Sequence, residues 1–201
     1  MELDRIDRLA ASSLEGYLVR KDLVRTFSRQ FPVPTYVVEF LLGRYCASID
    51  QEEIDEGLRI VQRQLASRTV KAGEEELFKA RAREQGEVKI IDIITARLDA
   101  KTDSYVATLP SLRLKDVCIN DELVNRHERM LTGGFYAEIT LGYDSTEARP
   151  FRVESLREIQ LSQREVLDIL AKARKNFTTE EWKDFLLRSI GIEPFGLPER
   201  Q

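Results

Sequence analysis

The chain is poor in the residues that build metal sites and disulfide frameworks. Its 201 residues include two cysteines and one histidine, with no CxxC pair and no His/Cys cluster. A zinc site is therefore not expected, and no other metal or cofactor is predicted. Cys46 and Cys118 each lie in an apolar run, which predicts two buried thiols in a reducing compartment.

Long apolar runs and low-complexity tracts are missing as well. No segment approaches the roughly 20 apolar residues of a membrane span, and the first residues lack the apolar core of a signal peptide. We therefore expect a cytoplasmic protein with no membrane partner. Glycine and proline are sparse, at 10 and 6 residues, so most of the chain should be folded.

Neither sign of charge dominates the chain. The net charge is −4, with 31 basic and 35 acidic residues, so the whole-molecule balance does not indicate nucleic-acid binding. Any such binding must use a local basic surface. The length and the 42% of hydrophobic residues suffice for one core, or two small ones, without metals or disulfides.

The first 86 residues carry apolar side chains at helical spacing. We predict helices over 3–14, 22–31, 35–47 and 51–68, the second capped by Asp22 and the last opened by a capping box of Asp50 and Glu53. A charged segment, 73–86, is predicted to be a solvent-exposed helix that ends near Gly86.

From residue 87 the hydrophobic period changes from about 3.6 to 2. Strands are predicted over 88–100, 105–109, 112–119, 135–143 and 150–161. The first is apolar on both faces, so we expect something to pack on each side of it. Between the third and fourth strands, Asn120 should cap a three-turn helix that carries His127, and Gly133 should adopt the left-handed conformation after it.

The order strand, strand, strand, helix, strand, strand is that of the five-stranded OB barrel. An open antiparallel sheet with one packed helix has the same order and stays an alternative. Helices are again predicted over 162–177 and 178–191, with a capping box of Thr178 and Glu181. The predicted fold class is α+β: a helical subdomain (1–86), an OB-like β-barrel with an inserted helix (87–161), and C-terminal helices with a linker (162–201).

Motifs for catalysis are absent from the sequence. His127 lies on the apolar face of its predicted helix, with no nucleophile at an informative spacing, so we expect it to pack rather than react. There is no GxxxxGK[ST] phosphate loop, and the Gly133–Gly134 pair precedes a strand rather than a helix. No enzyme active site is predicted.

Basic side chains on the predicted barrel are the remaining functional signal. OB barrels bind nucleic acids through strands two and three and the flanking loops. The candidate DNA-binding residues of the barrel are Arg97, Lys101, Arg113, Lys115, Arg126, Arg129, Arg149 and Arg152. A second basic set in the helical region comprises Arg20, Lys21, Arg25, Arg29 and Arg44. Acidic residues are at least as common in the same segments, so an ordinary charged surface is the competing interpretation.

Several runs of the sequence resemble one known family. They are EGYLVRKDLVRTF, FPVPTYVVEFLLGRYCAS, VKIIDIITARLDAKTDSYVATLPSLRLKDV, HERMLTGGFYAEITL, RPFRVESLREIQLS and NFTTEEWKDFLLRSIGIEP. Across nearly the whole chain the sequence resembles the amino-terminal region of the BrxL family, the Lon-like AAA+ proteins of bacterial BREX phage-defence systems.

The resemblance implies a longer protein, with an AAA+ ATPase module that carries a Walker A loop and then a Lon-protease-like domain. This sequence ends before that loop, so we expect it neither to hydrolyse ATP nor to cleave peptides. The family is similar to MCM-type helicase motors, whose amino-terminal tier combines a helical subdomain with an OB barrel. The stretch DSTEARPF between the last two strands is shorter than the family implies.

The resemblance also implies partners. We expect DNA, in duplex form, a ring of identical subunits in the full-length protein, and contacts with other BREX proteins. One alternative is a protein-interaction module that recruits partners or substrates to the Lon-like machine, which the acidic net charge and segment 73–86 suit equally well. Another is a tier that serves oligomerisation only, through the apolar segments 35–47 and 88–100.

Overall fold

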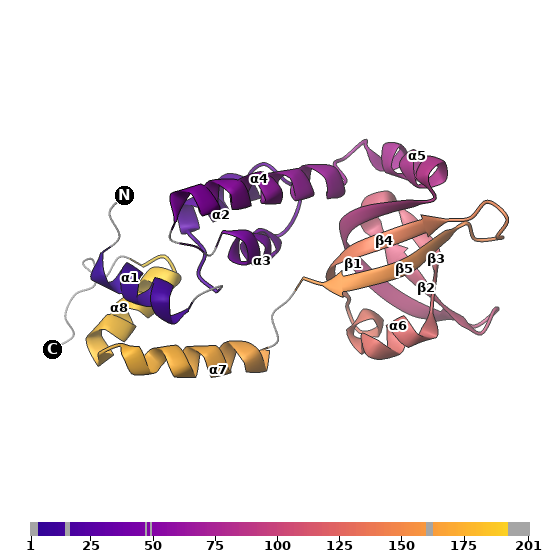
Figure 1. Cartoon of the computed structure of the whole chain (residues 1–201). Coiled ribbons are helices and arrows are strands. Elements are labelled where there is room, and N and C mark those ends of the chain that lie inside the picture. Colours follow the sequence, from indigo (N-terminus) through magenta and orange to yellow (C-terminus); the bar gives the residue numbers. More distant parts are fainter. Residues whose placement is uncertain (1–3, 15–16, 47, 49, 160–162, 193–201) are drawn as a thin grey trace.

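The change of hydrophobic period near residue 87 is also where helices give way to strands in the structure. This computed structural model describes residues 4–14, 17–46, 48, 50–159 and 163–192. Figure 1 shows an elongated molecule, with the β-barrel at one end and most of the helices at the other. The linker predicted at the end of the chain, at 193–201, lies outside the described residues.

Five helices precede the barrel: α1 (Arg5–Ser13), α2 (Lys21–Ser28), α3 (Thr35–Tyr45), α4 (Gln51–Arg68) and α5 (Glu75–Gln85). Of these, α2, α3 and α4 share a hydrophobic core. Asp50 caps α4 as predicted, its carboxylate accepting the backbone N–H groups of Glu52 (2.9 Å) and Glu53 (3.1 Å). Val38 and Leu41 of α3 are fully buried in the core that α2, α3 and α4 share. Most of the apolar surface of α3 is therefore used within the molecule, and the hypothesis that α3 also serves oligomerisation stays a prediction.

Asp22 does not cap α2. The helix begins one residue earlier, after Arg20, and no side chain caps it. The Asp22 carboxylate instead accepts two hydrogen bonds from the Arg20 guanidinium, at 2.6 and 3.2 Å. A nearby cation has thus displaced the backbone N–H groups that a capping aspartate would bind.

The strands close into a five-stranded barrel. They are β1 (Glu87–Asp99), β2 (Ser104–Leu109), β3 (Leu114–Ile119), β4 (Phe135–Tyr143) and β5 (Phe151–Glu158), in the order β1-β2-β3-β5-β4 with β4 paired back to β1. The connections include a 3-10 turn η1 (Pro110–Leu112), helix α6 (Asp121–Arg126) and a second turn η2 (Glu128–Leu131). Since β1 pairs on both sides, the open-sheet alternative is wrong. The comparison with MCM-type motors stays a prediction.

Strand β1 packs against a hydrophobic core on each face, as its sequence predicts. Ile90 and Ile94 lie in the barrel core, whereas Ile91 lies in the helical core with residues of α3 and α4. The helical half therefore rests on the outer face of β1, which makes β1 the element shared by both cores.

Helix α5 corrects one expectation. The sequence predicts a solvent-exposed helix, but Phe78 and Ala82 are buried in the barrel core. These two side chains are four residues apart and so share one helical face, which is enough to dock an otherwise charged helix. Figure 1 shows α5 and α6 on opposite sides of the barrel.

The connection between β3 and β4 is not the predicted three-turn helix. His127 leaves the helical conformation with φ −130°, and the turn η2 follows. The left-handed glycine is Gly134, at φ +76°, rather than Gly133. A Cβ atom at Gly134 would lie 2.3 Å from the carbonyl oxygen of Ile94 on β1. Only glycine fits this close approach of turn and strand.

The C-terminal helices pack at the end of the molecule far from the barrel (Figure 1). They are α7 (Gln163–Ala173), the turn η3 (Arg174–Asn176) and α8 (Thr179–Ser189). The predicted capping box of Thr178 and Glu181 is formed, and the Phe177 and Trp182 ring centroids lie 5.2 Å apart. An ion pair of 2.5 Å between Arg188 and Asp4 ties α8 to the start of α1.

Candidate nucleic-acid interface

The outer face of β1, β2 and β3 carries four of the predicted DNA-binding residues. Ala96, Ala107 and Val117 are paired across the three strands and lie in the barrel core. Because side chains alternate along a strand, the neighbouring positions point outward. Lys115 is exposed as well, at a shift in the β2–β3 register. We call this surface the β1–β3 face; its charged residues are Arg97, Asp99, Lys101, Arg113, Lys115 and Asp116.

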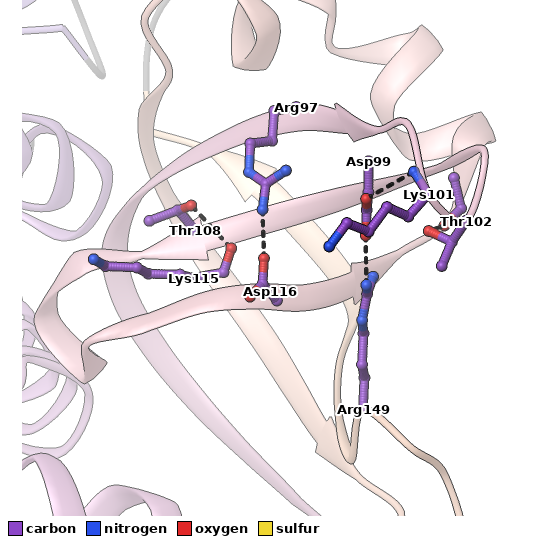
Figure 2. Close-up of polar contacts among 9 residues, drawn as sticks. Arg97, Asp99, Lys101, Thr102, Thr108, Lys115, Asp116 and Arg149 are labelled. Atoms are coloured by element: carbon purple, nitrogen blue, oxygen red, sulfur yellow. Dashed lines mark hydrogen bonds and ion pairs between the residues drawn. The ribbon is translucent and has the colours of Figure 1, made fainter.

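Arg97 on this face is paired with a carboxylate. Its guanidinium lies 2.5 Å from Asp116 on β3, and the two side chains reach across β2 (Figure 2). Val106, which is paired with Arg97 in the β1–β2 register, is fully buried although it faces outward. The ion pair therefore neutralises the middle of the face.

A second ion pair closes one end of the face. Arg149, in the loop after β4, lies 2.5 Å from Asp99 at the end of β1 (Figure 2). The hydrogen bond from Arg149 lowers the pKa of the Asp99 carboxyl. The same loop approaches β3, because the carbonyl oxygen of Arg149 accepts the Cys118 thiol at 3.7 Å. Cys118 is only half-buried, in contrast to Cys46, so the expectation of two buried thiols is half correct.

Lys101 and Lys115 are the unpaired cations of the β1–β3 face. Both side chains are exposed, and within the described part of the chain neither forms an ion pair. They lie toward opposite ends of the face in Figure 2, Lys101 in the β1–β2 turn and Lys115 on β3. They are the two charges of this face most available to a phosphate.

Arg113 is held by an unusual backbone conformation at the end of η1. Its φ is +54°, in the left-handed region, and its guanidinium lies 2.9 Å from Glu75 of α5. The turn before it is anchored from inside the barrel, where Asp92 accepts the backbone N–H (3.0 Å) and the hydroxyl (2.7 Å) of Ser111. Burial raises the pKa of Asp92, which is 1% exposed.

The remaining barrel candidates lie outside the β1–β3 face. Arg126 is exposed at the end of α6 and, among the described residues, forms no ion pair. Arg129 lies 3.9 Å from Glu158 and over the Phe135 ring, with 5.8 Å to its centroid. Arg152 on β5 lies 3.9 Å from Glu147.

His127 has a partner that its sequence position did not indicate. Its Nδ1 lies 3.0 Å from Glu158 of β5, and its ring packs 5.7 Å from that of Phe135. This half-buried pair joins the β3–β4 connection to β5. No nucleophile accompanies it within the described hydrogen bonds, so the packing role expected for His127 is consistent with the geometry.

The helical candidates form a separate surface. Arg20 is paired with Asp22 at 2.6 Å and Lys21 with Glu39 at 3.8 Å, while Arg25 is exposed. Figure 1 places α2 in the helical half, away from the barrel. Arg20 and Lys21 nevertheless line the same groove as the barrel residue Arg129, whereas no charged residue of the β1–β3 face lines it.

Comparisons with known proteins show the family to which the chain belongs. Residues 12–143 match the family model described as BREX system Lon protease-like protein BrxL N-terminal. The chain belongs to the BrxL family. Residues 151–201 match a second model, described as Lon-like protease BrxL-like, ATPase domain, so the two matches meet between β4 and β5.

Two curated BrxL relatives cover most of the chain. It is 38% identical over 198 residues to the Lon-like protease BrxL of Escherichia coli O9:H4 (strain HS). It is 35% identical over 188 residues to the Lon-like protease BrxL of Bacillus cereus (strain H3081.97). The alignments take in 97% and 92% of this chain but only 28% of each relative. The chain is thus similar to a fraction of a BrxL protein.

Nothing in the described part of this BrxL chain resembles a metal centre or a membrane span. No group of three or more potential ligand side chains is found there, and none of its helices is both long and apolar enough to cross a bilayer. The predicted DNA-binding residues stay a prediction, since no bound partner tests them.

Sequence reasoning missed one cluster of cations. Arg68 of α4, Lys89 of β1 and Arg157 of β5 line a pocket between the helical half and the barrel. Lys89 occupies an outward position of β1, and Arg68 follows Gln64 by one helical turn, so each element shows a polar side chain facing its neighbour. The pairing of the strands and the packing of α4 against them bring these side chains to one pocket.

Proposed function

We propose that this chain is a DNA-engaging and ring-assembly region of a BREX Lon-like protein, and that it acts by binding rather than by catalysis. The observation that carries the DNA-binding part is the exposed pair of unpaired lysines, Lys101 and Lys115, on the β1–β3 face of a closed five-stranded barrel. Small barrels of this kind bind nucleic acids through this part of their surface. Membership of the BrxL family supports the link to phage defence.

The charge pattern predicts weak, sequence-independent binding. Contacts to phosphates carry no sequence information, and the two arginines nearest to the lysines already have carboxylate partners. We therefore expect the affinity of the chain for duplex DNA to be low and to fall steeply with salt.

Fluorescence anisotropy with a labelled duplex at about 50 mM salt tests the DNA-binding part. The double variant Lys101→Gln/Lys115→Gln should lose at least about tenfold in affinity, because two phosphate contacts are removed. The matched control is Lys71→Gln/Lys175→Gln, which removes two exposed lysines elsewhere and should change the affinity less than about twofold. Equal losses in the two variants would contradict the assignment of the β1–β3 face.

The ring-assembly part is supported by apolar side chains exposed on the C-terminal helix α8 and just after it. Leu186 and Ile190 are 43% and 70% exposed. Neighbouring exposed apolar side chains of this kind commonly mark an interface. Sedimentation velocity over a range of concentrations should show self-association of the chain, reduced in Leu186→Gln/Ile190→Gln but not in Leu77→Gln, whose side chain is equally exposed on α5. A monomer at every concentration would contradict this part.

A groove favours the second candidate function, recruitment of other proteins. It has a volume of about 1580 Å³ and lies between the helices α1, α2, α3, α7 and α8 and the outer surface of β4, where Val166, Ile169 and Leu170 of α7 contribute apolar surface. Purified BREX-system proteins, tested one at a time by biolayer interferometry, would reveal a partner. Such a partner should be lost in Ile169→Asp and kept in Leu167→Asp, since Leu167 is on the same helix but outside the groove.

A further inference from the structure

A polar pocket of about 310 Å³ lies where the helical half meets the barrel. Its floor is the outer surface of β1, β4 and β5, where Lys89, Thr140 and Ser155 form one row across the three strands. Glu138 and Arg157 form the next row. Helices α3 and α4 contribute the opposite wall. We call this cavity the junction pocket.

Cations outnumber carboxylates in the junction pocket. Its charged lining residues are Arg44, Arg68, Lys89, Arg157 and the single carboxylate Glu138. Glu138 is bonded to Arg68 at 2.8 Å and lies 3.9 Å from Arg157. Within the described part of the chain, Arg44 and Lys89 have no ion-pair partner. The pocket therefore carries an excess of positive charge that the protein does not neutralise.

Two hydroxyl groups of the pocket also have no acceptor for their protons within the described part of the chain. The hydroxyls of Thr140 and Ser155 form no hydrogen bond among the described residues. Each can donate its proton to an entering oxygen atom. Hydroxyls and guanidinium groups together form a lining that suits an oxyanion and offers few acceptors to a cation.

Gln64 provides an independent indication of a ligand. Its Nε2 donates to the Tyr45 hydroxyl at 2.9 Å, while its Oε1 is buried without a partner. A half-turn of the amide lets the Tyr45 hydroxyl donate to Oε1 and leaves the NH₂ group facing the place that Oε1 now occupies. Buried polar atoms are almost always hydrogen-bonded. An acceptor in the junction pocket, which Gln64 lines, would give this NH₂ group a hydrogen-bond partner.

We propose that the junction pocket binds a phosphate group. A phosphate offers several acceptor oxygens and up to two negative charges, which matches the excess cations better than a carboxylate does. The phosphate can come from a small molecule, such as inorganic phosphate or a nucleotide, or from the backbone of a nucleic acid. The pocket shares no residue with the β1–β3 face, so it does not depend on the DNA-binding surface proposed above.

The test uses inorganic phosphate as the probe and isothermal titration calorimetry with the 201-residue chain. The variant Arg44→Gln/Lys89→Gln removes the two unpaired cations and leaves the Arg68–Glu138 pair intact, so the fold should be preserved. We expect it to lose at least about tenfold in phosphate affinity. The control Arg63→Gln/Lys175→Gln removes the same two kinds of charge from exposed positions and should change the affinity less than about twofold.

A nuclear magnetic resonance titration gives a local readout of the same event. Phosphate should shift the side-chain amide resonances of Gln64 in the wild type, and it should not shift them in Arg44→Gln/Lys89→Gln. Unchanged Gln64 resonances together with equal phosphate affinity in both double variants would overturn the proposal.

A duplex oligonucleotide, used in a second titration, identifies the source of the phosphate. If DNA affinity falls selectively in Arg44→Gln/Lys89→Gln, the pocket binds a backbone phosphate, even where inorganic phosphate alone binds too weakly to measure. If phosphate binding falls and DNA binding does not, the ligand is a small phosphate compound. Loss of neither overturns the inference. A chain that binds phosphate but no DNA would instead contradict the proposed function and leave the pocket assigned.

Discussion

Two surfaces of the same barrel differ in how many carboxylates accompany their cations. On the β1–β3 face, Arg97 and Arg149 are each paired at 2.5 Å with a carboxylate from another element. In the junction pocket, four cations surround Glu138, and two of them have no partner among the described residues. A count of basic residues alone would not separate the two surfaces, since the β1–β3 face and the junction pocket have four each.

The difference shows that strand register, rather than composition, decides where positive charge accumulates. Asp116 forms an ion pair with Arg97 because both side chains lie on the outer surface, on the two strands that flank β2. Lys89 meets Thr140 and Ser155 in its register row and encounters no acid. A chain with a net charge of −4 can thus carry unpaired cations both on the β1–β3 face and in the junction pocket of a single barrel.

A substitution inside the barrel should disturb one end of the β1–β3 face. Asp92→Ala removes the acceptor of two hydrogen bonds from Ser111 and so releases η1 and Arg113. We expect the free energy of unfolding to fall by about 2–4 kcal/mol, the range for a broken buried network. Urea denaturation measures this loss. The exposed control Asp168→Ala should cost less than about 0.5 kcal/mol, and a similar cost for both variants would contradict the anchoring role of Asp92.

Removal of the carboxylate that lines the junction pocket should increase the pocket's excess positive charge. Glu138→Gln leaves Arg68 and Arg157 without their carboxylate, so the free energy of unfolding should fall by about 1–2 kcal/mol. The same change should raise phosphate affinity several-fold, because the excess positive charge grows. Calorimetry and urea denaturation on one preparation measure both quantities. Glu154→Gln, an exposed acid on β5, is the control. Weaker phosphate binding by Glu138→Gln would contradict the assigned charge balance.

The pH dependence of stability separates Asp92 from the exposed carboxylates. Burial raises the pKa of Asp92 above its unfolded value, so the folded state binds this proton more tightly. The stability that this proton contributes is present below the unfolded pKa and is lost as the pH rises through the folded one, by about 1.4 kcal/mol for each unit between them. Asp99, whose pKa is lowered by Arg149, has the opposite dependence.

The free energy of unfolding of the wild type should therefore exceed that of Asp92→Asn by most in acid. This difference should shrink as the pH rises above about 4. Urea denaturation of both proteins at a series of pH values measures that difference directly. Asp99→Asn serves as the reference with the reverse trend. A constant difference between the wild type and Asp92→Asn would show that Asp92 titrates normally.

The smallest expected effect lies at the centre of the β1–β3 face. Asp116→Asn removes the partner of Arg97, and since both side chains are more than half exposed, stability should change by less than about 1 kcal/mol. Duplex affinity should rise several-fold, because one more arginine becomes available to a phosphate. The exposed control Asp55→Asn on α4 should leave affinity unchanged. An unchanged affinity for Asp116→Asn would place the DNA contact elsewhere.

Local patterns in the sequence predicted much of the fold. The β-branched run of β1 predicted packing on both faces, and the residues around Thr178 predicted the start of α8, because each signal depends on neighbours in sequence. The burial of α5 escaped prediction, since Phe78 is one large apolar residue in a charged segment. His127 ends its helix where a periodic pattern continues, because its side chain contacts Glu158 on a distant strand.

The candidate surfaces were predicted less well than the fold. The sequence identified Lys101 and Lys115, but it did not indicate that Asp116 and Asp99 neutralise the arginines between them. It named Arg44 only as a member of a helical basic set and did not predict the junction pocket, because the lining cations come from four elements far apart in the chain. Ion pairs between strands depend on register, which no local pattern specifies.

The salt dependence of duplex binding is the most direct test of the proposal that Lys101 and Lys115 bind phosphates of DNA. Fluorescence anisotropy of the unmodified chain between about 50 and about 200 mM salt gives the slope of log affinity against log salt. We expect a slope of about −2 or steeper, which corresponds to two or more phosphate contacts. In Lys101→Gln/Lys115→Gln the slope should be shallower by about 2. Affinity that does not change with salt, or the absence of binding even at about 50 mM, would contradict this proposal.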